Sequence, residues 1–156
     1  MHTANRIVIN ADPELVYQAA SQTTNWPAIL PHYRYVTSFY QGGDVQVVEM
    51  SANRDFGAFR YPTWWSSIQW NEPTQRRVRY RHVGGITRGM EVVWHITPLP
   101  NGHVQVIIDH ALHKRNPLVA LFYELVVGRL FVMFIAQRTL EGVKRWCEER
   151  GARTEG

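Results

Sequence analysis

Apolar and polar residues alternate along six segments in the middle of the chain. Each segment has the length of a strand and is rich in β-branched and aromatic residues, which is typical of a half-buried β-strand. Turns of only a few residues separate them, and such short connections predict antiparallel hairpins, because a parallel crossover needs about a dozen residues. A similar run lies at 6–10, and the six segments cover residues 33–40, 45–50, 63–70, 77–83, 90–97 and 104–112.

Two stretches after the first run predict short helices. Asp12 is a suitable N-cap and Pro13 a suitable first residue for a helix that ends at about residue 21. A second helical piece begins at the Trp-Pro pair of 26–27 and ends before Pro31, because the residue that precedes a proline avoids the helical region.

A long helix is expected from about residue 117 to 150, with apolar residues in two rows of helical spacing. The first row is expected to cover the sheet and comprises Phe122, Val126, Leu130, Met133, Leu140, Val143 and Cys147. The second comprises Leu121, Leu125, Val127, Phe131, Phe134 and Ile135. Because a helix that is apolar all round must bury both sides, the second row predicts a lid over a cavity and, beyond it, a homodimer contact or a peripheral membrane contact.

These elements predict an α+β fold in one domain over residues 1–156. The meander of strands must bury one face, and only the long helix is large enough to cover it. We therefore expect a curved antiparallel sheet of about seven strands wrapped around the C-terminal helix, with two short helices after the first strand. Such a sheet does not close at both ends, so a ligand-sized hollow is expected between the sheet and the helices.

Composition narrows the class of protein. The length of 156 residues suits a single domain, and 45% hydrophobic residues supply its core. The formal charge of +4 permits an acidic partner without requiring one. The only cysteine, Cys147, excludes an internal disulfide, and the first residues lack the pattern of a signal peptide, so we expect a cytoplasmic protein. Glu124 and Arg129 interrupt the apolar stretch of the long helix, so no integral membrane span is expected.

Alternation along the strands predicts which side chains face the hollow. If Trp65 faces inward, its neighbour Trp64 faces outward. On the next strand the arginines are expected outside, because buried unpaired charges are prohibitive, and this turns His82 inward. The predicted lining is aromatic, apolar or uncharged: Tyr33, Thr63, Trp65, Ser67, Gln69, Tyr80, His82, Met90, Trp94 and His110, with Met133 from the helix. It suits a flat, sparsely oxygenated ligand, and the alternative is a closed core filled by these side chains.

Other kinds of site are weakly indicated. His110 and His113 point to opposite faces of a strand, so no metal site is expected. Four arginines between 76 and 81 lie near tryptophans, as in nucleic-acid surfaces. Cross-strand pairing with Glu91 and Asp109 explains them more simply, and we expect no nucleic-acid partner. Phosphate-binding and dinucleotide motifs are absent from the sequence, so no cofactor is expected.

The order of these elements resembles the START-like helix-grip (SRPBCC) superfamily. The motifs that carry the resemblance are NADPELVY at 10–17 and Trp-Pro at 26–27. The sequences WPAILPHY at 26–33, WWSS at 64–67 and GMEVVW at 89–94 are similar to those of bacterial aromatic polyketide aromatase/cyclases, in the polyketide cyclase/dehydrase family. The resemblance covers nearly the whole chain and implies a helix-grip fold.

The resemblance also implies a chemistry. Those enzymes cyclise and dehydrate a carrier-bound polyketone chain inside the cavity, without metal or nucleotide. Residues that match their cavity lining are Trp26, Tyr33, Trp65, Ser67 and Met90. Two positions depart from the family: Gln69 replaces a cavity arginine, and His32 replaces an acidic residue. Because a neutral amide stabilises a developing enolate less than a charged donor, Gln69 weakens the expected catalysis.

The sequence therefore favours a protein that binds a small hydrophobic, aromatic or polyketide-like ligand in an internal cavity. An enzyme would also need a polarising donor and a proton shuttle near one reacting atom. Tyr33 with His110 or Gln69 is the candidate catalytic set. The alternative is a non-enzymatic carrier or chaperone for a lipid or quinone, and a ligand sensor is a third class.

Overall fold

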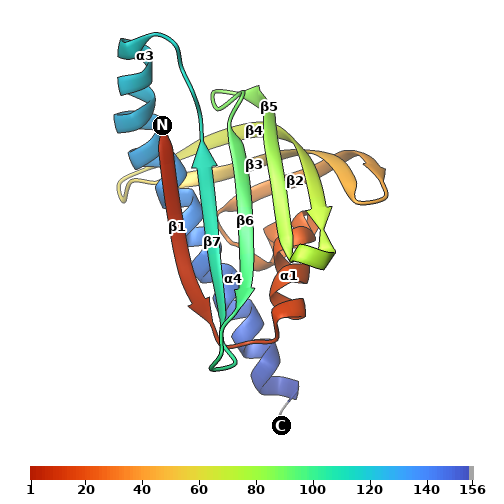
Figure 1. Ribbon diagram of the computed structural model, residues 1–156. Helices are drawn as coiled ribbons and strands as arrows, with labels where there is room; N and C mark the ends of the chain where they lie inside the picture. Colours follow the sequence, from red (N-terminus) through yellow and green to blue (C-terminus); the bar gives the residue numbers. More distant parts are fainter. Residues whose placement is uncertain (155–156) are drawn as a thin grey trace.

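Seven antiparallel strands and a long C-terminal helix make up the structure, a computed structural model that describes residues 1–154 (Figure 1). Their order in the sheet is β1-β7-β6-β5-β4-β3-β2, so consecutive strands pair as hairpins and β1 lies beside β7. The predicted meander is confirmed. The strands are β1 (His2–Ile9), β2 (Tyr33–Gly42), β3 (Val45–Asp55), β4 (Arg60–Glu72), β5 (Arg77–Gly85), β6 (Glu91–Pro98) and β7 (Val104–Ala111).

The helices follow the expected order. Asp12 caps α1, where its Oδ1 accepts a hydrogen bond of 2.8 Å from the Glu14 backbone N–H. The long helix changes geometry along its length, from α-helix through ten residues of π-helix and back to α-helix. In chain order the elements are α1 (Pro13–Ser21), the 3₁₀ turn η1 (Thr23–Asn25), α2 (Trp26–Ile29), the 3₁₀ turn η2 (Pro73–Gln75), α3 (Pro117–Phe122), the π-helical η3 (Tyr123–Val132) and α4 (Met133–Thr154).

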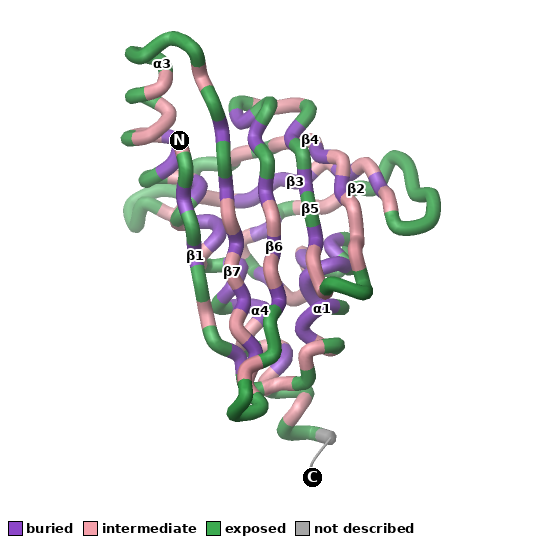
Figure 2. Tube along the Cα trace, viewed as in Figure 1, coloured by how far each residue is buried: buried purple, intermediate pink, exposed green. Residues whose placement is uncertain are grey.

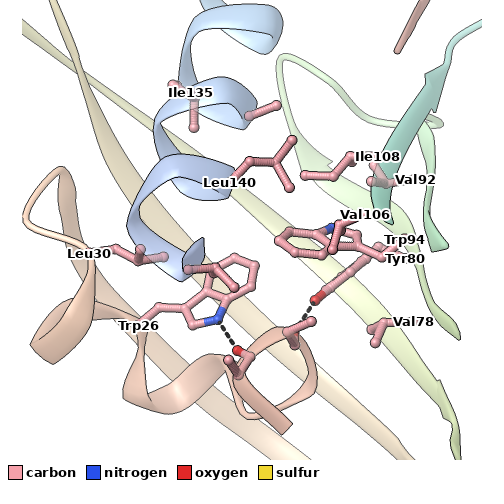
Figure 3. Close-up of a cluster of buried hydrophobic side chains, with 14 of the residues drawn as sticks. Trp26, Leu30, Val78, Tyr80, Val92, Trp94, Val106, Ile108, Ile135 and Leu140 are labelled. Atoms are coloured by element: carbon pink, nitrogen blue, oxygen red, sulfur yellow. Dashed lines mark hydrogen bonds between the residues drawn. The ribbon is translucent and has the colours of Figure 1, made fainter. Parts of the chain in front are cut away.

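The inward face of the sheet forms the core together with α1, α2 and the long helix. Burial alternates along β5, β6 and β7, as the sequence predicts, and Figure 2 shows the alternation along each strand. Figure 3 shows Trp26, Tyr80 and Trp94 gathered with Leu140 of α4 in this core. The curved sheet thus holds the helix in a helix-grip fold.

The first strand begins four residues earlier than predicted, at His2. Thr3 and Asn5 are polar but buried, and this hides the alternation from the sequence. Asn5 faces the long helix, where its Nδ2 donates to the Met133 carbonyl over 3.2 Å. Asn5 therefore links β1 to the long helix just after the π-helical segment ends.

The predicted division of the long helix into two rows is wrong in its first half. Leu130 and Met133 of the first row are 43% and 38% exposed, whereas Val127 and Ile135 of the second row are buried. The cause is the geometry of η3, because i→i+5 bonding widens each turn beyond 3.6 residues. In this wider turn, residues spaced three or four apart no longer lie on one face of the helix, so part of the predicted row turns away from the core.

The arginines on β5 face outward as predicted, and Arg81 lies directly opposite Glu91 in the β5–β6 register, but Arg77 and Arg79 have a partner that was not expected. Glu72 of β4 accepts hydrogen bonds from Arg77 and from Arg79, the latter at 2.7 Å. Asp109 instead lies 3.4 Å from His95. Glu72 comes directly before η2, and the sharp turn there returns the chain to place both arginines beside it.

Candidate ligand-binding site

A cavity of about 400 Å³ lies between the concave face of the sheet, α2 and the long helix. Strands β2 to β7 contribute to its wall, and η3 and the start of α4 cover it. Its lining includes no Asp, Glu, Lys or Arg among the described residues. The cavity is thus an uncharged, mostly apolar compartment of the size that ligand sites have.

Five rings form an aromatic belt along the cavity: Trp94, Trp26, Tyr33, Trp65 and His82. Neighbouring ring centroids lie 5.7, 5.1, 6.1 and 5.9 Å apart in that order. The last pair, Trp65 and His82, is stacked with an interplanar angle of 8°. The other rings meet at an angle: Tyr33 lies edge-on to both Trp26 and Trp65. Such contacts fix the rings against one another, and the parallel pair of Trp65 and His82 is the flat part of the belt.

The polar atoms of two cavity rings are directed away from the cavity. Trp26 Nε1 donates to the Ala19 carbonyl over 2.9 Å, and the Tyr80 hydroxyl donates to the Ala20 carbonyl over 3.4 Å (Figure 3). Both carbonyls belong to the last turn of α1, where helix geometry leaves acceptors without a partner. These two hydrogen bonds give the carbonyl groups at the end of α1 their partners, and the faces of the two rings remain available to line the cavity.

Two histidines in the cavity wall are neutral at physiological pH. Burial lowers the pKa of His82 to about 3, and the neighbouring His110 lowers it further in the same direction. Burial, with a smaller effect of His2, lowers the pKa of His110 to about 4. His82 Nδ1 lies 2.6 Å from Thr87 Oγ1. His110 Nδ1 has no hydrogen-bond partner within residues 1–154, so a ligand atom that reaches it would supply one.

Tyr33 is another ionisable residue of the wall. Burial raises the pKa of Tyr33 well above its ordinary value, and a hydrogen bond with Thr139 opposes this in part. The Thr139 hydroxyl also lies 3.0 Å from His32 Nε2 and donates to the Ile135 carbonyl over 2.7 Å. Burial lowers the pKa of His32 to about 4. Tyr33 therefore stays a neutral phenol.

Most of the residues predicted to line the cavity do so. The structure brings together nine of them, from α2, β2, β4 to β7 and the β5–β6 loop: Trp26, Tyr33, Thr63, Trp65, Tyr80, His82, Met90, Trp94 and His110. It places three outside the lining: Ser67, Gln69 and Met133. Whether the nine bind a ligand stays a prediction.

Gln69 does not face the cavity, contrary to the prediction. Its Nε2 donates to the Ser21 carbonyl at 2.7 Å and to Asn71 Oδ1 at 2.8 Å. Its Oε1 accepts from Thr23 Oγ1 and from Gln46 Nε2, each at 2.9 Å. Gln69 is fully buried, so all of its hydrogen-bonding capacity serves the junction of α1 with the sheet. No donor remains for a substrate carbonyl.

Ser67 and Met133 lie outside the cavity for different reasons. Ser67 is inward and fully buried, but its hydroxyl is packed within the core and has no partner among the described residues. Met133 lies on the outer side of the helix because η3 shifts the helical faces.

Sequence reasoning predicted a lid from the second apolar row of the helix, and Val127, Phe131 and Ile135 of that row do line the cavity, but it missed the mouth. Tyr61, Ile86 and Phe122 line the mouth and are also exposed. An apolar residue in a hairpin or loop has no periodicity that would reveal it. Thr139 could have been found, because it is a polar residue on the otherwise apolar inner side of the helix. Within residues 1–154, no three His, Cys, Asp or Glu side chains are grouped as metal ligands.

Solved structures share this fold. TTHA0849 from Thermus thermophilus superposes with a TM-score of 0.77 at 17% identity, covering 100% of both chains. The Zhui aromatase/cyclase from Streptomyces sp. R1128 gives a TM-score of 0.68 at 22% identity, covering 93% of this chain and 94% of that one. A START superfamily protein from Mycobacterium smegmatis gives 0.63 at 14% identity over 98% of both chains. At these identities the similarity establishes the fold.

Sequence comparison establishes the family. No curated protein matches the chain. The sequence model described as "Polyketide cyclase / dehydrase and lipid transport" matches residues 9–137, from the end of β1 to the early part of α4. This span contains α1, α2 and every residue predicted for the cavity. The chain therefore belongs to the polyketide cyclase/dehydrase and lipid transport family.

Proposed function

We propose that the protein binds a flat, hydrophobic ligand with an aromatic or polyketide-like skeleton, and that binding rather than chemistry is its main task. The observation that carries this proposal is the aromatic belt around an uncharged cavity. Its rings would contact a planar ligand face to face or edge to face, while an extended acyl chain would gain less from them. The neutral histidines and phenol favour an uncharged ligand, because a buried charge would lack a partner there.

A few polar groups would orient such a ligand. Tyr33 and His110 both line the cavity, and His110 Nδ1 is buried without a partner, so these residues suit a ligand that carries carbonyl or hydroxyl groups. The remaining wall is apolar, so the number of oxygen atoms on the ligand would be small. A quinone or a partly reduced polycyclic ketone has this character.

The place of Gln69 argues against a fully active cyclase. In that chemistry a donor polarises a carbonyl as an enolate develops, and removing such a donor typically costs about 10²–10³ in rate. Here the side chain at that position is committed to α1 and the sheet. A carrier, by contrast, needs only the cavity and a mouth.

Native mass spectrometry of freshly purified protein tests this function. We expect a retained apolar compound that leaves on denaturation and is released unchanged. A charged or purely aliphatic compound, or no uptake of any flat aromatic probe by the emptied protein, would contradict the proposal.

A second candidate function is dehydration or cyclisation by Tyr33 and His110. The free Nδ1 of His110 favours it, since a neutral imidazole that faces a cavity can accept a proton. Incubation with a poly-β-ketone substrate, followed by mass spectrometry, distinguishes the two functions. Loss of water in the wild type that disappears in Tyr33→Phe and His110→Gln would establish an enzyme.

Cytoplasmic residence and the oligomeric state are also proposals. Cell fractionation tests the first and light scattering during gel filtration the second. We expect a monomer in the absence of membranes, because the helical surface described below suits lipid better than a second copy.

A further inference from the structure

The mouth of the cavity lies within a patch of exposed apolar side chains. Ile86, Tyr61 and Phe122 line the mouth and are 58%, 53% and 47% exposed. Farther out on α3, Leu118 is 78% exposed. We call the patch the mouth surface and define it by Phe59, Tyr61, Ile86, Leu118, Leu121 and Phe122.

Contacts among three elements make the mouth surface continuous. The Tyr123 hydroxyl of η3 donates to the Ile86 carbonyl over 2.7 Å, which ties the helix to the β5–β6 loop. The rings of Tyr61 and Phe131 lie 5.6 Å apart, which ties the β3–β4 hairpin to the helix. Figure 1 shows α3 projecting beyond the end of the sheet. The patch is thus one end of the molecule.

The helix at this end is apolar but not buried. None of the six residues of α3 is buried, although all are apolar. The helix Pro117–Arg153 is long and apolar enough to cross a membrane, and only 22% of its most apolar 18-residue window is buried. Its second half, however, is part of the core, where Leu140 and Val143 are fully buried. A helix held in this way can touch a bilayer without crossing it.

Unpaired cations surround the mouth surface. Arg60, Arg88, Arg115 and Arg129 are exposed, and none has an ion pair in the described part of the chain. Three carboxylates lie nearby: Glu124 is 3.8 Å from the N-terminal ammonium, Asp55 accepts from the Gly57 backbone N–H over 2.8 Å, and Glu91 lies opposite Arg81 in the β5–β6 register. The surface therefore combines apolar side chains with an excess of positive charge.

We propose that the mouth surface docks on an anionic membrane. Apolar side chains would enter the boundary between headgroups and acyl chains, and the arginines would pair with lipid phosphates. A second copy fits less well, because a symmetric contact would place these unpaired arginines opposite one another. Docking would open the cavity toward lipid, so a hydrophobic ligand would pass between them without crossing water. This last consequence rests on the proposed function, whereas docking itself does not.

Sedimentation with vesicles tests the proposal. The protein is expected to bind vesicles of phosphatidylcholine with phosphatidylglycerol, to bind phosphatidylcholine alone far less, and to be released by high salt. The variant Leu118→Ser/Leu121→Ser is expected to weaken binding tenfold or more, roughly as lost apolar burial requires. Arg88→Glu/Arg115→Glu is expected to weaken it about thirtyfold or more on anionic vesicles only.

Matched controls lie elsewhere on the surface. Phe39 of β2 is 66% exposed, and Arg145 of α4 is exposed. Phe39→Ser and Arg145→Glu should leave vesicle binding unchanged. Because all of these positions are exposed, the variants should fold, which circular dichroism would show.

Three outcomes would overturn the proposal. They are no binding to anionic vesicles, equal weakening by the control variants, and a dimer in solution that Leu118→Ser/Leu121→Ser dissociates while vesicles go unbound. Titration of the same variants with a soluble aromatic probe separates this test from that of the cavity. If the protein binds the probe but does not bind vesicles, the membrane-docking proposal is refuted and the proposed function of the cavity is not.

Discussion

The indole of Trp65 is stacked on the imidazole of His82, with ring centroids 5.9 Å and planes 8° apart. The pair joins β4 to β5 across the cavity wall. Burial keeps His82 neutral, and a hydrogen bond between its Nδ1 and Thr87 fixes the orientation of the ring. The imidazole therefore packs as a fixed flat surface against the indole. The wall at this point is rigid, apolar and ready to receive a planar ring.

Trp65→Ala should weaken the binding of a neutral three-ring probe such as anthraquinone. Loss of the stacked indole is expected to cost about 1–3 kcal/mol, or roughly tenfold to a hundredfold in Kd. Quenching of the remaining tryptophan fluorescence measures it. Trp70→Ala is the control, because Trp70 lies on the opposite face of the same strand and does not line the cavity. Equal losses in both variants would refute the assigned lining.

Stability should fall as the pH is lowered below 6.5. In the unfolded chain histidine has its ordinary pKa of 6.5, whereas burial lowers the pKa of His110 to about 4. The unfolded state then binds a proton that the folded state does not, so stability is complete above pH 6.5 and declines toward pH 4. At pH 5 the contribution of His110 alone is about 2 kcal/mol, and His82 and His32, whose pKa burial also lowers, add to the decline. Urea unfolding at pH 7 and 5 should show a smaller decline in His110→Gln, and an unchanged one in the exposed-site control His113→Gln.

Gln69→Leu should destabilise the fold without a direct effect on the cavity. The change leaves the Ser21 carbonyl and the Thr23 and Gln46 side chains without their partner, which is expected to cost about 2–4 kcal/mol. Thermal unfolding measures the loss, and probe affinity below the transition should be unchanged. Gln105→Leu, on the outward face of β7, is the control. If the variant is as stable as the wild type but no longer binds the probe, Gln69 is part of the binding site and the prediction is wrong.

Gly85→Ala should be among the costlier glycine substitutions. Gly85 has φ of +87° at the bulge between β4 and β5, and an added Cβ would lie 2.5 Å from the Trp64 carbonyl oxygen. Gly102 has a similar φ of +82° but nothing within 4 Å of an added Cβ. Gly102→Ala is expected to cost about 1 kcal/mol and Gly85→Ala about 3 kcal/mol or more. Equal losses in urea unfolding would show that the close approach is not real.

The fold was predictable because strand alternation and helical spacing report burial directly. His82 was placed on the inward face because alternation would otherwise bury the arginines of its strand, and Thr63 was placed there on the assumption that Trp65 faces inward; the structure confirms these orientations. Alternation gives the face of a residue but not its position along the cavity, and this is why Gln69 was misplaced. It shares the inward face of Trp65, yet four residues farther along β4 the space is already filled by α1.

The π-helical segment was not predictable. Its residues are as apolar as those of an α-helix, and only the hydrogen bonds reveal the wider turn. Met133 was therefore assigned to the wrong side of the helix. The mouth surface shows a similar limit, because the second apolar row indicated an uncovered face but not that it surrounds the cavity entrance.

The most direct test of the cavity as a ligand site is to fill it. Ala136 of α4 is buried and lines the cavity, so the indole of Ala136→Trp would occupy the ligand volume. Titration with anthraquinone should give one bound molecule per wild-type chain, and no binding to Ala136→Trp, while the exposed-site control Ala152→Trp binds like the wild type. Unchanged binding in a folded Ala136→Trp variant would contradict the account.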